Sequence, residues 1–189
     1  MIEIFLSASV PLPDRNRKFY DTADVFLIRE AIRALIEVIL PIGRITFGGH
    51  PAITPLISLY VEHSRLERDR LTIFQSAFFQ GQMPVENDEF FDVKIIPAIR
   101  NNLQLSILAM RKAMITSKKF HAAVLIGGME GIKAEETLFR KYNPGAIVLP
   151  VPATGAAARM VFNEGNYAPE LENEISFASM FRRKLLPAP

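Results

Sequence analysis

The chain has 189 residues, of which 49% are hydrophobic and 22% are charged, with a formal net charge of +2 at pH 7. A mean hydropathy of +0.16 is slightly apolar for a soluble protein. Together these values favour one domain, with either an α/β fold around a buried sheet or an apolar surface hidden in an oligomer. The complete absence of cysteine excludes disulfides, thiolate metal ligands and a cysteine nucleophile.

The beginning of the chain is a short apolar run, Ile2 to Leu6, without the basic leader of a signal peptide. It predicts a buried strand. No stretch of the sequence reaches the roughly 18 apolar residues of a membrane span. We therefore expect a cytoplasmic chain without a membrane partner, and the small net charge predicts no affinity for nucleic acid.

Apolar runs and helical periodicities alternate along the rest of the chain. Further strands are predicted at residues 44–47, 71–74, 93–96, 122–126 and 146–151. Helices are predicted at residues 24–39, 51–66, 101–116, 131–142, 155–162 and 170–186. Loops are predicted at residues 7–13 and 80–91, where proline, glycine and acidic residues gather.

Two of these helices are predicted mainly from the spacing of their apolar residues. Apolar side chains recur at three- and four-residue intervals between 24 and 39, and Thr22 or Asp24 is expected to cap that helix. The helix over residues 101–116 is expected to be amphipathic, with Leu105, Leu108 and Lys112 in helical register.

The predicted strands are continuous apolar runs, which is typical of strands with both faces covered. Strands that alternate with helices favour a doubly wound parallel sheet, a three-layer α/β/α fold of the Rossmann-like class.

Two glycine turns each close a predicted strand and open a helix. The first is Gly48-Gly49, and the second is Gly127-Gly128. Glycine lets the backbone turn tightly and lets a ligand approach it closely. The helix that follows directs free N–H groups and a partial positive charge at that point. Two such turns predict one crevice suited to a phosphate-bearing small molecule.

Several side chains near these turns are candidates for ligand contacts, and each has a structural alternative. Glu135 suits ribose hydroxyls, yet an acidic residue in the first helical turn is also ordinary. His50 suits phosphate or a capping role, and Arg111 suits an anion or plain solvent exposure. The candidate ligand-binding residues are Ser7, Ala8, Ser9, Gly48, Gly49, His50, Arg111, Gly127, Gly128, Met129, Glu130, Gly131 and Glu135.

No metal or cofactor is expected, because His63 and His121 have no partner at ligand spacing. The basic run at residues 182–184 could contact nucleic acid or membrane. A solvated helix end, where the helix dipole favours positive charge, is the preferred interpretation.

In combination, these motifs resemble the SLOG superfamily, which groups the Lonely Guy phosphoribohydrolases with the DNA-processing Smf/DprA domain. The Lonely Guy pattern has a glycine-rich turn, a helix with Met-x-x-Arg-Lys, and Pro-Gly-Gly-x-Gly-Thr-x-x-Glu. Here Gly48-Gly49, Arg111-Lys112 and the segment from Gly127 to Glu135 match it. The resemblance implies a nucleotide-binding domain over residues 1–189, with a helical tail from about residue 168.

The match departs from the hydrolase pattern at the phosphate-binding turn. Ile126 replaces the proline, Ile132 replaces the threonine, and one extra residue separates Gly128 from Gly131. The segments at residues 5–11, 48–55 and 127–131 are more similar to SLOG branches of bacterial defence and conflict systems. That resemblance implies sensing of an ADP-ribose-like or cyclic nucleotide signal, with an effector protein as a partner. The slightly apolar composition separately predicts a homodimer or higher homo-oligomer.

Three functions therefore stay open. The first is a binding module for a nucleotide-derived ligand. The second is a phosphoribohydrolase that cleaves the N-glycosidic bond of a nucleoside 5′-monophosphate, for which the resemblance implies Arg111 and Glu135 as catalytic residues. The third is an assembly role, in which Phe177, Met180 and Phe181 form a dimer face or else pack on their own chain.

Overall fold

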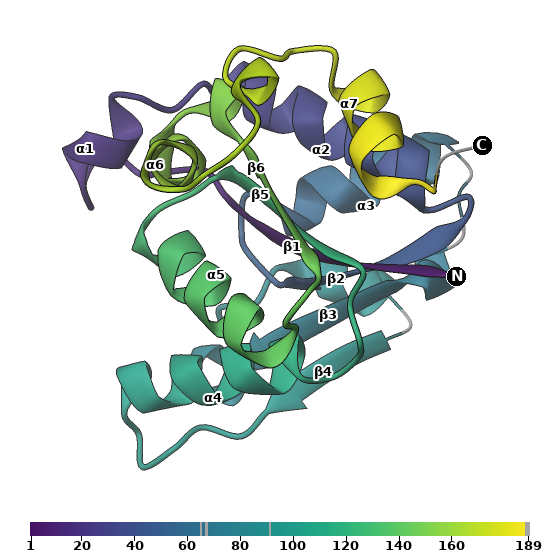
Figure 1. Cartoon of the computed structure of the whole chain (residues 1–189). Helices are drawn as coiled ribbons and strands as arrows, with labels where there is room; N and C mark the ends of the chain where they lie inside the picture. Colours follow the sequence, from purple (N-terminus) through teal and green to yellow (C-terminus); the bar gives the residue numbers. More distant parts are fainter. Residues whose placement is uncertain (65, 67, 91, 188–189) are drawn as a thin grey trace.

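Six strands form one parallel sheet in the order β4-β3-β2-β1-β5-β6 (Figure 1). This computed structural model describes residues 1–64, 66, 68–90 and 92–187. The strands are β1 (Ile2–Ser9), β2 (Gly43–Gly48), β3 (Leu71–Ser76), β4 (Asp92–Ile96), β5 (Ala122–Gly127) and β6 (Ile147–Val151). The predicted doubly wound α/β class is confirmed.

Seven α-helices connect and flank these strands in the described residues. They are α1 (Arg17–Tyr20), α2 (Val25–Ile39), α3 (Thr54–Ser64), α4 (Leu103–Ile115), α5 (Glu130–Tyr142), α6 (Ala156–Glu164) and α7 (Phe177–Leu185). Asp24 caps α2, as predicted, by accepting a hydrogen bond from the Leu27 amide at 2.9 Å. None of the helices is long and apolar enough to cross a membrane within the residues described.

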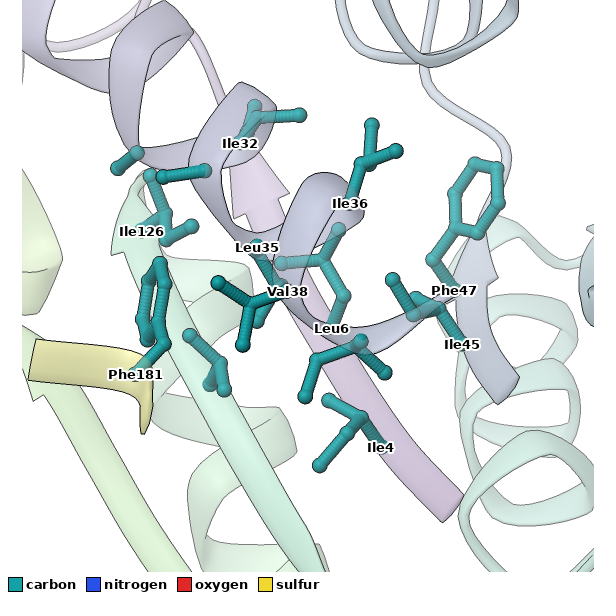
Figure 2. Packing of buried hydrophobic residues seen from close by; sticks show 14 of the residues in the cluster. Ile4, Leu6, Ile32, Leu35, Ile36, Val38, Ile45, Phe47, Ile126 and Phe181 are labelled. Carbon is teal, nitrogen blue, oxygen red and sulfur yellow. The ribbon is translucent and has the colours of Figure 1, made fainter. Parts of the chain in front are cut away.

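The sheet has two covered faces, because successive side chains of a strand point to opposite sides. Along β1, Ile4 and Leu6 belong to the cluster under α2, α3 and α7. Figure 2 shows side chains of β1, β2, α2, β5 and α7 gathered in that cluster. Phe5 points to the opposite face, where α4, α5 and α6 pack. The same alternation places Ser7 on the face of α4 and α5.

Some predicted boundaries were wrong at the ends that matter for the site. Residues 7–9 continue β1 instead of forming a loop, because Ser7, Ala8 and Ser9 pair with Leu125, Ile126 and Gly127 of β5. A neighbouring strand that extends this far supplies the backbone partners that a loop would lack.

The helices beside the glycine turns also begin at other residues than predicted. α3 begins three residues later, at Thr54, and its predicted end near Leu66 crosses residues outside the description. α5 begins one residue earlier, at Glu130, which places Glu135 in its second turn instead of its first. The predicted loop at 80–91 contains a short 3-10 helix, Val85–Glu89, and ends at Phe91, which lies outside the described residues.

Helix α4 forms where it was predicted, and the leucines that indicated it do not lie on its buried face. Leu105 and Leu108 are 43% and 49% exposed. The buried side chains of α4 are instead Ser106, Met114 and Ile115. The spacing of apolar residues identified a helix here without identifying the face that meets the sheet.

The apolar tail residues pack on their own chain. Phe177, Met180, Phe181 and Leu185 of α7 belong to the buried cluster beside α2. These side chains are therefore not available as a dimer face, and the alternative of intrachain packing is the one observed. Two residues of the nearby basic run form ion pairs, Arg183 with Glu174 at 2.9 Å and Lys184 with Glu170 at 2.8 Å.

Phe181→Ala should lower the free energy of unfolding by about 3–5 kcal/mol, because it empties a fully buried aromatic site. Urea denaturation measures this change. The exposed Ile175→Ala is the matched control and should change stability by less than about 0.5 kcal/mol. An unchanged denaturation midpoint for Phe181→Ala would show that α7 does not pack on α2 in solution.

Candidate functional site

A crevice of about 560 Å³ lies at the carboxyl ends of the strands, where ligands bind in open parallel α/β sheets. Its walls come from the end of β1, the turn between β2 and α3, helix α4 and the start of α5. The predicted ligand-binding residues that line it are Ser7, Ala8, Ser9, Gly48, Gly49, His50, Arg111, Met129, Glu130, Gly131 and Glu135. Gly127 and Gly128 are not among the lining residues.

One carboxylate joins three elements inside the crevice. Glu135 of α5 accepts a hydrogen bond from Ser7 Oγ at 2.5 Å through one oxygen, and from Arg111 Nε at 3.0 Å through the other. Both charged side chains are partly buried, with 22% of Arg111 and 15% of Glu135 exposed. The three residues are 24 and 128 positions apart along the chain, so only the fold brings them together.

Gly131 allows Arg111 to reach this position. A Cβ atom at residue 131 would lie 2.6 Å from Nη2 of Arg111, which is closer than nonbonded atoms approach. The guanidinium therefore lies against the backbone at the start of α5. Its two Nη groups have no protein acceptor within the part of the chain that the structure describes, so they can donate to a ligand.

The glycine amides do not form the free phosphate cradle that the sequence predicted. Gly127 N donates to Thr154 Oγ1 at 2.9 Å, Gly128 N donates to the Ser9 carbonyl at 2.8 Å, and Gly49 N donates to the Phe74 carbonyl at 3.0 Å. Gly127 and Gly128 have φ values of +58° and +80°, which only glycine adopts easily. Their role is to turn the chain from β5 into α5.

Glu130 occupies the first position of α5, where an anion would otherwise bind. Its carboxylate accepts a hydrogen bond from Asn16 Nδ2 at 2.9 Å. A hydrogen bond from its own amide lowers the pKa of the Glu130 carboxyl, and Asn16, Arg15 and Lys18 add to this against an opposing effect of burial. The chain thus places its own carboxylate at this helix terminus.

His50 is held by backbone bonds at the turn between β2 and α3. Its Nδ1 accepts from the Ala52 amide at 3.2 Å, and its own amide donates to Thr54 Oγ1 at 3.1 Å. Because Nδ1 is the acceptor, the neutral ring carries its proton on Nε2. Burial lowers the pKa of His50, and the nearby charge of Arg15 lowers it further.

Several lining residues were not predicted from the sequence. They are Leu6, Arg15, Phe47, Ile53, Phe79, Gln104, Ile107, Met110, Ile132 and Ala134. A signal existed for two of them, because Gln104 and Ile107 precede Arg111 at helical spacing and share its face. No three His, Cys, Asp or Glu side chains gather at metal-binding distance in the described residues.

His50 should titrate below its ordinary pKa of 6.5. NMR titration of the three histidine rings measures this midpoint, and loss of one signal in His50→Gln assigns it. Arg15→Ala should raise the midpoint without restoring 6.5, because burial is the larger cause. Arg33→Ala, at an exposed position of α2, is the control.

The sign of the effect on stability follows from the lowered pKa. The folded state favours the neutral ring. The contribution of His50 to the free energy of unfolding is therefore fully present above pH 6.5, and it is lost as the pH falls below 6.5 and the unfolded chain takes up protons. His50→Gln should therefore lose less stability than the unmutated chain between pH 7.5 and 5. A midpoint at or above 6.5 would contradict the described burial of the ring.

Comparisons with known proteins agree with this architecture. The crystal structure of the protein TM1055, a structural-genomics target, is similar to this chain with a TM-score of 0.59 and 12% sequence identity. The match covers 97% of this chain and 99% of that chain, and at this identity it shows the shared fold. A search of curated proteins finds no significant match. The sequence model of the SLOG cluster3 family matches residues 18–185, so the chain belongs to the SLOG cluster3 family.

Proposed function

We propose that the crevice binds a nucleotide-derived small molecule, of the ADP-ribose-like or cyclic nucleotide class, and that the chain senses this ligand without consuming it. Membership of the SLOG family and the shared fold support a nucleotide-related role. The observation that carries the proposal is the Ser7–Glu135–Arg111 network inside the crevice.

The chemistry of this network suits a ribose phosphate. An ionised carboxylate only accepts hydrogen bonds, and each of its two oxygens has two acceptor positions. Ser7 and Arg111 use one position on each oxygen of Glu135, which leaves one on each for the hydroxyls of a ribose. The Nη groups of Arg111 supply charged donors for the neighbouring phosphate.

The departures at the glycine turns favour binding over hydrolysis. Because the amides of Gly49, Gly127 and Gly128 donate to protein acceptors, phosphate recognition is left to the guanidinium groups. A ligand held in this way is recovered intact. The similarity to SLOG branches of bacterial defence systems supports a signal-sensing role, in which the bound state is passed on to an effector protein.

Arg111→Ala should weaken binding of ADP-ribose about 10- to 100-fold, which is the loss expected for a charge-assisted hydrogen bond. The measurement is the ligand-induced rise in melting temperature over a series of concentrations. Each variant is compared with its own melting temperature without ligand, because removal of Arg111 also leaves the Glu135 carboxylate without its cation.

Arg33→Ala serves as the matched control for loss of a guanidinium far from the crevice. It should bind like the unmutated chain. If AMP, NAD, ADP-ribose and cyclic ADP-ribose at saturating concentrations all leave the melting temperature of the unmutated chain unchanged, the binding proposal is wrong.

One observation favours a second function, hydrolysis of the N-glycosidic bond of a nucleoside 5′-monophosphate. The arginine and the glutamate of the Lonely Guy pattern are present as Arg111 and Glu135 and lie 3.0 Å apart in the crevice. In this reaction the bond from C1′ to the base breaks, the base leaves with a proton, and water adds to C1′. Glu135 would stabilise the positive charge that develops on the ribose, while Arg111 holds the phosphate.

Glu135→Gln should then reduce release of the base about 100- to 1000-fold, because it removes the charge that stabilises the transition state. Chromatography of AMP after incubation measures the released base. The exposed Glu37→Gln is the matched control and should release base at the unmutated rate. If the unmutated chain released no base, this function would be excluded. If Glu135→Gln released base as fast as the unmutated chain, Glu135 would not be its catalytic residue.

A further inference from the structure

The outer end of the crevice contains two further polar residues, Arg15 and Asn16. They belong to the segment after β1, which is not part of the family motifs. Asn16 caps α1 by accepting from the Lys18 amide at 3.1 Å, and its Nδ2 donates to Glu130 at 2.9 Å. This side chain therefore fastens the segment after β1 onto the start of α5. Arg15 precedes Asn16 in this segment.

Arg15 lines the crevice and is exposed. Among the residues that the structure describes, its guanidinium forms neither an ion pair nor a hydrogen bond. Arg15, His50 and Glu130 all line this crevice, and the charge of Arg15 contributes to lowering the pKa of both His50 and the Glu130 carboxyl. An unpaired guanidinium beside a carboxylate and a neutral imidazole donor is a combination of groups that a phosphate and a ribose would satisfy.

Each end of the crevice thus contains one arginine and one glutamate, which are paired at the inner end and unpaired at the outer end. At the inner end Arg111 accompanies Glu135, and at the outer end Arg15 accompanies Glu130. Both glutamates come from α5, where a rise of about 1.5 Å per residue separates their backbones by about 7.5 Å along the axis. A mononucleotide whose ribose and phosphate fill the inner end has only its base left for the outer end.

We propose that Arg15 and Glu130, with His50 beside them, form a second ribose-phosphate subsite, so that the ligand carries two ribose-phosphate units joined through a pyrophosphate. ADP-ribose is the simplest probe of this class, and AMP is the matching fragment with a single unit. The inference rests on the proposed function, since it assigns the inner end to the first unit.

The test compares ADP-ribose with AMP by isothermal titration calorimetry on the full chain. The unmutated chain should bind ADP-ribose at least about tenfold more tightly than AMP. Arg15→Ala and Glu130→Gln should each weaken ADP-ribose about 3- to 10-fold, because these exposed groups interact through solvent. Both variants should bind AMP within about twofold of the unmutated chain, whereas Arg111→Ala should weaken both ligands.

Arg33→Ala is again the control for loss of an exposed positive charge. Equal affinity for the two ligands, or an equal effect of Arg15→Ala on both, would overturn the second subsite and leave the proposed function intact. Weaker AMP binding by Glu130→Gln would place the base at the outer end and would also overturn it. If neither ligand binds the unmutated chain, the proposed function fails and this inference fails with it.

Discussion

The crevice depends on the carboxylate of Glu135, which holds β1, α4 and α5 together through Ser7 and Arg111. A partly buried ion pair adds little net stability, because both charges give up water to form it. Removal of one partner is costly, however, since the remaining charge stays where water reaches it poorly. The pair therefore acts mainly by fixing geometry: it sets how far α4 stands from α5 and keeps the guanidinium against the backbone at Gly131.

The glycine turns serve this geometry in another way than the sequence suggested. Their amides are already bonded to protein acceptors, and a buried backbone N–H without a partner would be costly. The positive φ values at Gly127 and Gly128 let β5 turn directly into α5. The start of the helix then lies beside the ends of β1 and β2, and its own Glu130 takes the position of an anion. Positive charge for a ligand is consequently supplied by arginine side chains.

Much of the fold could be predicted because apolar runs and helical periods are local properties of the chain. The strand order and the exact wall of the crevice are not local. The spacing around Leu105 and Leu108 identified α4, but the neighbouring face with Ile107 and Arg111 is the one that lines the crevice. The periodic spacing of apolar residues indicates a helix with an apolar face, but it does not show which face of the helix packs on the sheet.

The contacts between the residues of the site could not be predicted from local sequence patterns either. Ser7, Arg111 and Glu135 were each predicted as candidates from their own surroundings, yet their contact arises only from the sheet order and the pleat of β1. Arg15 and Asn16 had no such signal. They belong to a short polar segment that contacts the crevice through a hydrogen bond from Asn16 to Glu130, 114 residues further along the chain.

The arrangement around Glu135 also bears on the proposal that the crevice binds a ligand without consuming it. A carboxylate that stabilises a developing positive charge acts best when its own charge is directed at the reacting carbon. Here Arg111 and Ser7 already draw on both oxygens of Glu135, so its remaining acceptor positions suit the hydroxyls of a ground-state ribose. Interactions that are equally strong in the ground state and the transition state bind a ligand without accelerating its reaction. Under the proposed function, this network therefore suits a site that binds its ligand better than one that hydrolyses it.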